Sequence, residues 1–242
     1  FMNMNYGDIQ ITTTELPEGG IGTFSPSSTN FNIAYAKKFS SSISGGLNLK
    51  VVSQAISNVR AQGIAIDAGI RYVTGETDNI KFAISLKNVG PPMSFSGDGL
   101  SIDMLNPSTS ISIGMKQRVS TFELPSQLNI GASYDFNFNE SNKLTIASTF
   151  SANSFSRDQI RGGLRYTLSS EKAVFSIVAG YVYENSLLNT EEVATALSGP
   201  SGGFSFLFPF GSSNSKIGID YCFRQSVLGG MHTVGARINI GE

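Results

Sequence analysis

The sequence predicts an all-β fold, a transmembrane antiparallel β-barrel, and three observations lead to this prediction. Apolar and polar residues alternate over runs of about ten residues, the length that a tilted strand needs to cross a bilayer. Charged residues are 14% of the chain, against about 25% in typical soluble proteins, although the mean hydropathy is only +0.01. The connections between the runs are alternately short and long, as in outer-membrane barrels.

The stretch GIAIDAGIRYV illustrates the alternation. It places Ile64, Ile66 and Ile70 on one face of a strand, and Asp67 and Arg71 on the other. A soluble sandwich would bury the apolar face, whereas a membrane barrel would turn it toward lipid. An Arg or Lys on the lipid face costs about 2–4 kcal/mol near the bilayer midplane. A barrel therefore explains why the charged residues share one parity, that is, one of the two alternating faces of a strand.

About twelve runs carry this division, and they are longer than the five or six residues usual in sandwich strands. The first run is expected at Met2–Thr13. The apolar residues of the others span 31–35, 43–51, 64–72, 80–86, 128–138, 144–150, 160–168, 175–183, 204–210, 217–223 and 234–240. The range 111–123 also alternates, but we assign it to a loop because only then do short and long connections alternate.

The connections define the expected domain organisation. Short turns are expected at 40–42, 75–79, 139–141, 169–171 and 211–214, and longer links at 14–30, 53–62, 89–125, 153–158 and 184–202, with a compact link at 226–229. Residues 1–242 are therefore predicted to form a single barrel domain, with long extracellular loops at 89–125 and 184–202. The chain opens FMNMNYGDI, without a signal peptide and in a strand-like run, so we expect an N-terminal portion to precede it.

Several kinds of chemistry lack the residues that they require. No run approaches the 18 uninterrupted apolar residues of a transmembrane helix, and a net charge of -1 gives no reason to expect nucleic-acid binding. The single cysteine, Cys222, excludes an internal disulfide, and one His with one Cys cannot form a typical transition-metal site. His232 is interpreted as a packing residue rather than a catalytic base. We expect no enzyme activity, cofactor or metal.

The polar parity carries charges that would face the barrel interior. Ten basic and three acidic residues share it, which could attract anions or could form a structural network that fills a narrow barrel, and we favour the network. Lys143 and Lys216 belong to this set. The predicted lumen charge network consists of Lys50, Asp67, Arg71, Lys81, Lys87, Asp135, Arg161, Arg165, Asp220, Arg224 and Arg237.

The two long loops contain apolar residues that are candidates for binding a partner. Apolar side chains on an extracellular loop mark either a partner surface or a cap that packs on itself, and both alternatives stay open here. In the loop at 89–125 the candidates are Pro91, Pro92, Met93, Phe95, Leu100, Ile102, Met104 and Leu105; in the second loop they are Val193 and Leu197.

Five stretches resemble a known family: MNMNYGDIQITT, FNIAYAKKFSSSISGGLNLKVV, GIAIDAGIRYV, IKFAISLKNVGPPMSF and FELPSQLNIGASYDF. Together they resemble the PorV/PorQ family of outer-membrane β-barrels, which belong to the type IX secretion system of Bacteroidota. The most specific part is LKNVGP at Leu86–Pro91, followed by FELP at Phe122–Pro125. These motifs resemble the family without assigning a branch of it.

The resemblance implies a FadL-like barrel of about fourteen strands, integral to the bacterial outer membrane and in contact with its lipid. It implies a non-enzymatic role in protein secretion. PorV-like members accept secreted proteins by their type IX C-terminal signal domain and carry them from the translocon to the surface-attachment machinery, whereas PorQ-like members anchor a surface partner.

Two other functions remain as alternatives. A FadL-like transporter would pass hydrophobic small molecules through the barrel, and would need an apolar pocket in a lumen whose visible parity is polar. A soluble or surface β-sandwich adhesin would need its aromatic faces buried.

Overall fold

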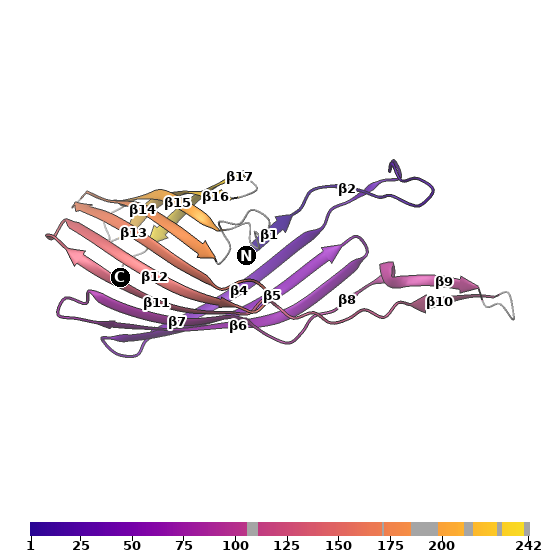
Figure 1. The fold of residues 1–242 in the computed structure, drawn as a ribbon, viewed down its shortest axis with the longest axis horizontal. Coiled ribbons are helices and arrows are strands. Elements are labelled where there is room, and N and C mark those ends of the chain that lie inside the picture. The colour runs from indigo at the N-terminus through magenta and orange to yellow at the C-terminus, as the bar shows by residue number, and fades with distance from the viewer. Residues whose placement is uncertain (106–110, 171, 185–197, 211–214, 227–228, 240–242) are drawn as a thin grey trace. The chain divides into compact units, whose positions relative to one another are not determined.

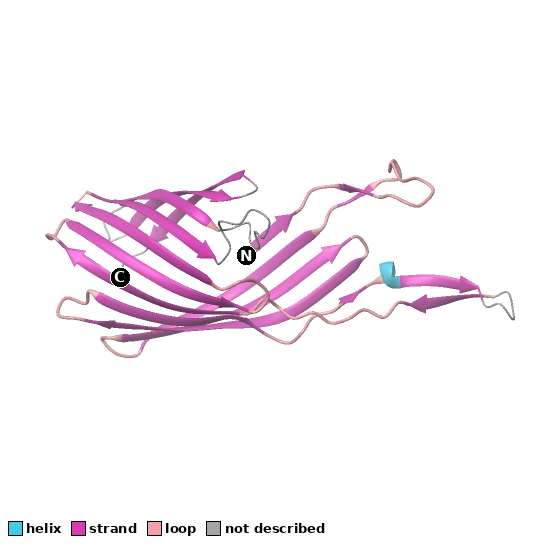
Figure 2. Ribbon diagram, in the orientation of Figure 1, coloured by secondary structure: helices cyan, strands magenta, loops and turns pink. Residues whose placement is uncertain are grey.

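The computed structural model describes residues 1–105, 111–170, 172–184, 198–210, 215–226 and 229–239. Most of these residues lie in strands, and the only helical element among them is the short 3₁₀ turn η1, Asp98–Leu100 (Figures 1 and 2). The described part of the chain holds no helix that is long and apolar enough to span a bilayer.

The main sheet contains thirteen strands, and twelve of them follow one another in chain order. Its order is β1-β4-β5-β6-β7-β11-β12-β13-β14-β15-β16-β17, and β8 pairs with β6 beside this path. The path begins at β1 (Met2–Asn5), β4 (Ser27–Lys38), β5 (Ile43–Ile56), β6 (Val59–Thr74) and β7 (Ile80–Val89). It continues through β11 (Gln127–Asn137), β12 (Asn142–Asn153), β13 (Gln159–Ser170), β14 (Ala173–Glu184), β15 (Gly199–Pro209), β16 (Lys216–Ser226) and β17 (Gly229–Asn239).

Neighbouring strands from β11 to β17 pair antiparallel along nearly their full lengths, so the sheet is an up-and-down meander. Two short ribbons lie outside the main sheet: β2 (Ile9–Gln10) with β3 (Thr23–Phe24), and β9 (Ser101–Leu105) with β10 (Ser112–Lys116). The predicted all-β, antiparallel barrel-type fold with about twelve strands is confirmed, and the strand pairings form an open path that ends at β1 and β17.

The chain divides into two compact units. Unit 1 consists of Phe1–Ala36, Gly46–Ala68 and Lys87–Pro125, and unit 2 consists of Lys37–Gly45, Gly69–Leu86 and Ser126–Glu242. The boundary passes through strands rather than linkers, since β4, β5, β6 and β7 each contribute residues to both units.

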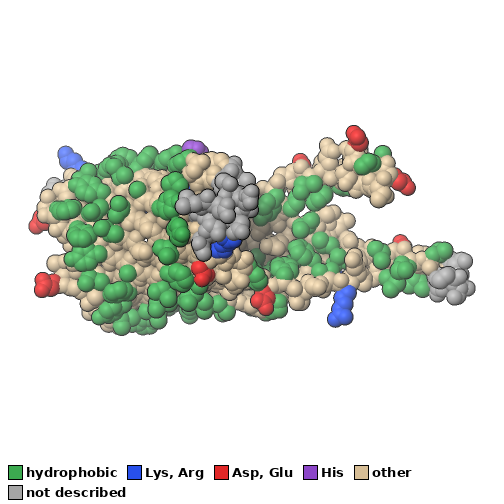
Figure 3. Space-filling view, viewed as in Figure 1, with side chains coloured by type: hydrophobic (Ala, Val, Ile, Leu, Met, Phe, Trp, Pro, Cys, Tyr) green, Lys and Arg blue, Asp and Glu red, His purple; other side chains and the backbone are tan. Residues whose placement is uncertain are grey.

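The apolar parity of the strands lies on the exposed face. Ile64, Leu164 and Ile177 are about half exposed, at 52%, 50% and 52%, although each lies inside a strand. The hydrophobic side chains that are buried in the described residues are few: Val52, Ala61, Ala65, Met93, Leu124 and Val182. Figure 3 shows hydrophobic side chains spread over the outer surface of the strands. This distribution is that of a membrane barrel and the reverse of a soluble sandwich.

The first predicted strand, Met2–Thr13, is wrong as a single element. Only β1 joins the main sheet, where Met2 pairs with Asn30 and Asn5 pairs with Ser27. The chain then turns at Gly7, whose φ of 86° favours glycine, and β2 pairs with β3 instead. Apolar residues alternate on both sides of this turn, Met2 and Met4 before it and Ile9 and Ile11 after it, but their parity shifts by one residue across Gly7.

The predicted long link at 53–62 is also wrong. Strand β5 ends at Ile56 and β6 begins at Val59, so Ser57 and Asn58 alone connect them. Ser57 adopts a φ of 49°, in the left-handed region that two-residue hairpin turns require. The turn lacks the Asn-Gly or Asp-Gly pair that usually marks such hairpins, and polar residues on both sides extended the apparent loop.

We predict that a charge on the exposed face of a central strand position destabilises the protein in lipid. Ile177→Lys, near the middle of β14, is expected to reduce the free energy of unfolding by about 2–4 kcal/mol, because lysine replaces an apolar side chain that contacts lipid. The matched control is Ser176→Lys, one residue away on the opposite parity. Guanidinium unfolding in lipid vesicles measures both, and equal losses would contradict the assignment of the two faces.

Candidate functional site

The segment between β7 and β11, residues 89–125, forms the longest excursion from the main sheet. It contains β8 (Phe95–Ser96), η1, β9 and β10. Its outgoing part lies against β6, where Ala61 pairs with Phe95 and Arg60 with Ser96. The outgoing and returning parts also meet each other, at a two-residue bridge described below. The excursion is therefore attached to the sheet by backbone hydrogen bonds before it reaches the β9–β10 hairpin.

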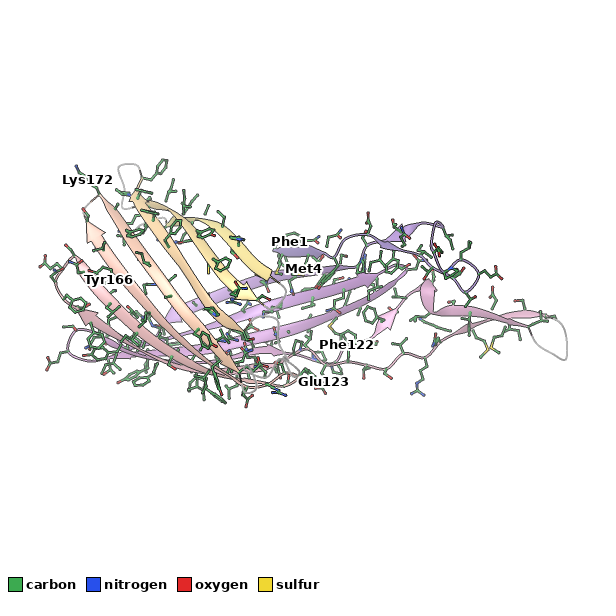
Figure 4. The ribbon with its side chains drawn as sticks, turned by 45° about the horizontal axis from the view of Figure 1, so that its top comes forward. Phe1, Met4, Phe122, Glu123, Tyr166 and Lys172 are labelled. Atoms are coloured by element: carbon green, nitrogen blue, oxygen red, sulfur yellow. The ribbon has the colours of Figure 1, made fainter. Side chains whose placement is uncertain are left out.

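The root of the excursion is an apolar cluster in unit 1. The amide of Met93 donates to the carbonyl of Phe122 and the amide of Phe122 donates to the carbonyl of Met93, both at 2.7 Å. The rings of Phe95 and Phe122 stack with centroids 5.5 Å apart. Phe122 lies on the segment that returns from β10 to β11 (Figure 4). Met93 is only 2% exposed, and it packs in a cluster with Val52, Ala61, Ala65 and Leu124.

This packing corrects the expectation for two predicted partner-binding residues. Met93 is buried and Phe95 is half-buried, so both stabilise the excursion rather than present a surface to a partner. Pro91 and Pro92 are exposed, and Leu100 is half-buried. The physical reason is the pairing of β8 with β6, which brings the outgoing chain over small residues such as Ala61.

Two glycines allow this close approach of backbone to backbone. A Cβ at Gly90 would overlap the carbonyl oxygen of Ile64, and a Cβ at Gly97 would overlap that of Asn58. Gly97 also has a φ of 144°, which side chains rarely permit. The glycines of VGPP and SGDG are thus required where the excursion runs along β6.

A polar clamp joins the two ends of the excursion. The side-chain amide of Asn88, at the end of β7, donates to the carbonyl oxygen of Pro125 at 2.9 Å. The ammonium group of Lys50 donates to the Asn88 Oδ1 at 2.8 Å, and the Asn88 backbone amide donates to an oxygen of Asp67 at 2.8 Å. Asn88 has a φ of 57°, a conformation that asparagine tolerates better than most residues.

The clamp is itself held by an ion pair. Lys50 Nζ lies 2.7 Å from Asp67 Oδ2, and the Asn48 side-chain amide donates to the same oxygen at 3.0 Å. Both charged side chains are 18% exposed, so the pair is shielded from solvent more than a surface ion pair. Strands β5, β6 and β7 thereby fix the position at which LKNVGP and FELP meet.

The β9–β10 hairpin extends beyond this root and has one apolar face. Ile102 pairs with Met115 and Met104 pairs with Ile113, and the four side chains are 46–50% exposed. The opposite face contains Ser101, Asp103 and Leu105 from β9 with Ser112, Gly114 and Lys116 from β10. A two-stranded hairpin is at best marginally stable alone in water, so an unpaired apolar face of this kind is suited to contact with another molecule.

The predicted lumen charges form separate groups rather than one network. Lys50 and Asp67 belong to the clamp in unit 1. In unit 2, Asp135 contacts Lys81, accepts a hydrogen bond from Thr145 at 2.6 Å, and lies 3.9 Å from Lys143.

A second group in unit 2 joins Arg237, Asp220 and Ser205. Arg237 donates to Asp220 at 3.0 Å and to Ser205 at 3.1 Å. Elsewhere, Arg161 donates to Gln159 at 2.8 Å, and Arg224 is near enough to repel it electrostatically. The remaining predicted charges have no ion pair within the described residues: Arg71 and Arg165 line hollows, and Lys87 is exposed.

Sequence reasoning missed several residues of these groups. Asn48 was not singled out, and Asn88 and Pro125 were identified only as parts of LKNVGP and FELP, although the Asn before Val-Gly-Pro-Pro is a signal for a left-handed residue at a strand end. The sequence also did not indicate the buried pair in which the Ser151 hydroxyl donates to Asn129 Oδ1 at 2.7 Å. Val193 and Leu197, predicted on the second loop, lie outside the described residues.

The residues considered for catalysis or metal binding have other contacts. His232 Nδ1 lies 2.8 Å from the hydroxyl oxygen of Tyr221, and its ring packs on Phe223 with centroids 5.1 Å apart. Cys222 is half-buried beside a hollow in unit 2. Within the part of the chain that the structure describes, no three His, Cys, Asp or Glu side chains are grouped so as to hold a metal ion.

The fold is similar to that of solved membrane barrels. The structure titled "CymD monoaromatic hydrocarbon channel" matches with a TM-score of 0.52 and 12% identity, over 89% of this chain and 73% of that one. BamA from Haemophilus ducreyi lacking POTRA domains 1-3 matches over 93% of this chain and 62% of its own, at 11% identity and a TM-score of 0.33, too low to support an argument. No family model matches the chain, and no curated protein is detectably similar in sequence. The similarity establishes the fold of an outer-membrane β-barrel.

We predict that the Asn88 clamp restrains the root of the excursion. Asn88→Gly removes the side-chain hydrogen bonds to Lys50 and Pro125 but keeps the backbone free to adopt positive φ, and is expected to cost about 1–2 kcal/mol. Asn88→Ala should cost about 1 kcal/mol more, because its Cβ is strained in the left-handed region.

Hydrogen–deuterium exchange of residues 90–96 measures this effect, with β11 as an internal reference. Faster exchange in both variants, and fastest in Asn88→Ala, is the expected result. Exchange of this segment at the wild-type rate would show that the Met93–Phe122 bridge holds the root without the clamp.

Proposed function

We propose that the chain is part of an integral outer-membrane protein that binds a protein partner through the apolar face of its β9–β10 hairpin. The observation that carries the proposal is a set of two exposed cross-strand pairs, Ile102 with Met115 and Met104 with Ile113. They lie on a segment whose root is held by the apolar cluster and by the Asn88 clamp. A rooted hairpin presents its face with less loss of conformational freedom on binding than a free loop would.

The membrane location is supported by the apolar character of the exposed face of the strands. The strands expose the parity that carries their large apolar side chains, as at Ile64 and Ile177, and keep the charged parity on the other face. Antiparallel pairing satisfies the backbone hydrogen bonds of the strands without water. Lipid is therefore the environment that suits the exposed face, and the fold is the one that outer-membrane proteins use.

The resemblance to the PorV/PorQ family supports a more specific role. In that role the protein takes up secreted proteins by their type IX C-terminal signal domain, or anchors a secretion subunit, and passes cargo from the translocon to the surface-attachment machinery. Two parts of the resembling motif, LKNVGP and FELP, meet at the Asn88–Pro125 hydrogen bond, so the motif positions the excursion. The role is one of recognition, and it uses no covalent chemistry.

We predict that the apolar face of the hairpin is required for partner capture. The full-length tagged protein is purified in mild detergent, and co-purified proteins are quantified by mass spectrometry. The variant Ile102→Ser/Met104→Ser/Ile113→Ser/Met115→Ser should recover at least about tenfold less partner, because apolar anchors dominate interface energies. Recovered proteins should carry the type IX signal domain or belong to its translocon.

The matched control changes the opposite face of the same ribbon, with Asp103→Asn/Lys116→Gln. It should recover the partner at the wild-type level. A deletion of residues 91–105 is a poorer test, because it also removes buried Met93 from the root. Equal recovery from the serine variant and the wild type would refute the proposed docking face.

Transport of small molecules is the second candidate function. It is favoured by the similarity in fold to a structure titled as a hydrocarbon channel and by hollows on the charged side of the sheet in unit 2. Charged and hydroxyl side chains line much of these hollows, which does not suit a hydrocarbon. Purification of the barrel alone, with co-purified lipid or fatty acid, would favour this candidate over partner binding.

A further inference from the structure

Unit 2 contains an open hollow of about 660 Å³ in which cationic, hydroxyl and apolar side chains lie together. Its volume is within the range of sites that hold small organic molecules. Strands β7 and β11–β17 contribute to the lining, all from residues of the same unit. The hollow has no part in the partner binding proposed above, and it adjoins the side chains that the sequence assigned to the lumen.

The charges around the hollow do not balance. Two carboxylates and four cationic groups line it: Asp135, Asp220, Lys81, Lys143, Arg165 and Arg237. Both carboxylates already have partners, since Asp135 contacts Lys81 and accepts from Thr145, and Asp220 accepts from Arg237.

Two cations are left without a close carboxylate. Arg165 makes no ion pair in the described part of the chain, and Lys143 reaches Asp135 only at 3.9 Å. The positive charge therefore exceeds what the hollow needs for its own neutralisation. A structural network that merely filled the interior would have no use for the excess.

The excess of positive charge continues in an adjoining hollow of about 420 Å³. It shares Lys81, Lys143 and Asp135 with the first, and it adds Lys38 and Arg71 against the single carboxylate of Asp78. The chain as a whole has a net charge of -1, so positive charge is concentrated on this side of unit 2. A concave surface with an excess of one sign of charge raises the local concentration of ions of the opposite sign.

An apolar patch lies directly beside Arg165. The register pairs Arg165 of β13 with Val178 of β14, and pairs Val174 of β14 with Leu207 of β15. All four residues line the hollow. The hydroxyl groups of Thr167 and Ser176, which lie 3.1 Å apart, are between the Arg165–Val178 pair and the apolar Val174–Leu207 pair along the strands.

We propose that this hollow binds a small organic anion that carries one carboxylate and one apolar group, with the carboxylate at Arg165 and the apolar group against Val174, Val178 and Leu207. A guanidinium group can hold a carboxylate by two parallel hydrogen bonds, and the neighbouring patch removes the apolar group from water. A hydrocarbon would leave Arg165 without a partner, and an inorganic anion would leave the patch unused.

The test titrates three probes into the full-length protein in detergent by calorimetry. Benzoate has both features, benzyl alcohol has the ring without the charge, and phosphate has the charge without the ring. Benzoate should bind, and the other two should bind at least about tenfold more weakly. Equal binding of benzyl alcohol would overturn the role of the cations, and equal binding of phosphate would overturn the role of the apolar patch.

Two variants locate the site. Arg165→Gln should weaken benzoate binding roughly tenfold, because a charge-assisted hydrogen bond is lost, whereas Arg118→Gln, the same change on the exposed excursion, should leave it unaltered. Val178→Thr keeps the shape of the side chain and should also weaken benzoate binding. Wild-type affinity in either hollow variant would overturn the proposal. Partner capture by the hairpin is measured separately, so failure of one proposal does not imply failure of the other.

Discussion

The antiparallel hydrogen-bond ladder is the constraint on which the rest of the structure depends. Each backbone amide and carbonyl of a central strand is paired with a neighbouring strand, so the strands can expose apolar side chains to a medium without water. Once one parity faces outward, most charged side chains of the strands lie on the other. Both the clamp around Asp67 and the hollow beside Arg165 exist because of this separation.

Most of the fold could be predicted from the sequence because alternation is a local signal. Ile64 and Ile66 face outward, and Asp67 lies on the opposite face, as the period of two residues requires. The misassigned parts are those at which the chain turns without a conspicuous turn motif. Gly7 takes the chain out of the first strand, and Ser57 reverses it between β5 and β6 with neither Asn-Gly nor Asp-Gly to mark the place.

The candidate sites were harder to predict, because their residues come together through register. Parity identified Lys50 and Asp67 as interior charges, but it could not show that they would bind the same asparagine, or that Asn88 would reach Pro125 across 37 positions in the chain. Composition likewise could not separate Met93, which is buried, from Met104, which is exposed, since both stand in the same apolar excursion. Met93 is buried because β8 pairs with β6 and brings this part of the excursion over Ala61.

The hydrogen bond between Asn88 and Pro125 also makes the excursion resemble an insert in a continuous meander. The chain leaves β7 and enters β11 at positions that already touch, so the two strands could be joined by a short connection without displacing either. What the insert adds to the sheet is a cover of Met93 and Leu124 over Ala61 and Ala65. The length of the hairpin beyond that cover can therefore change without disturbing β7 or β11, while the cover and the clamp limit change at its base.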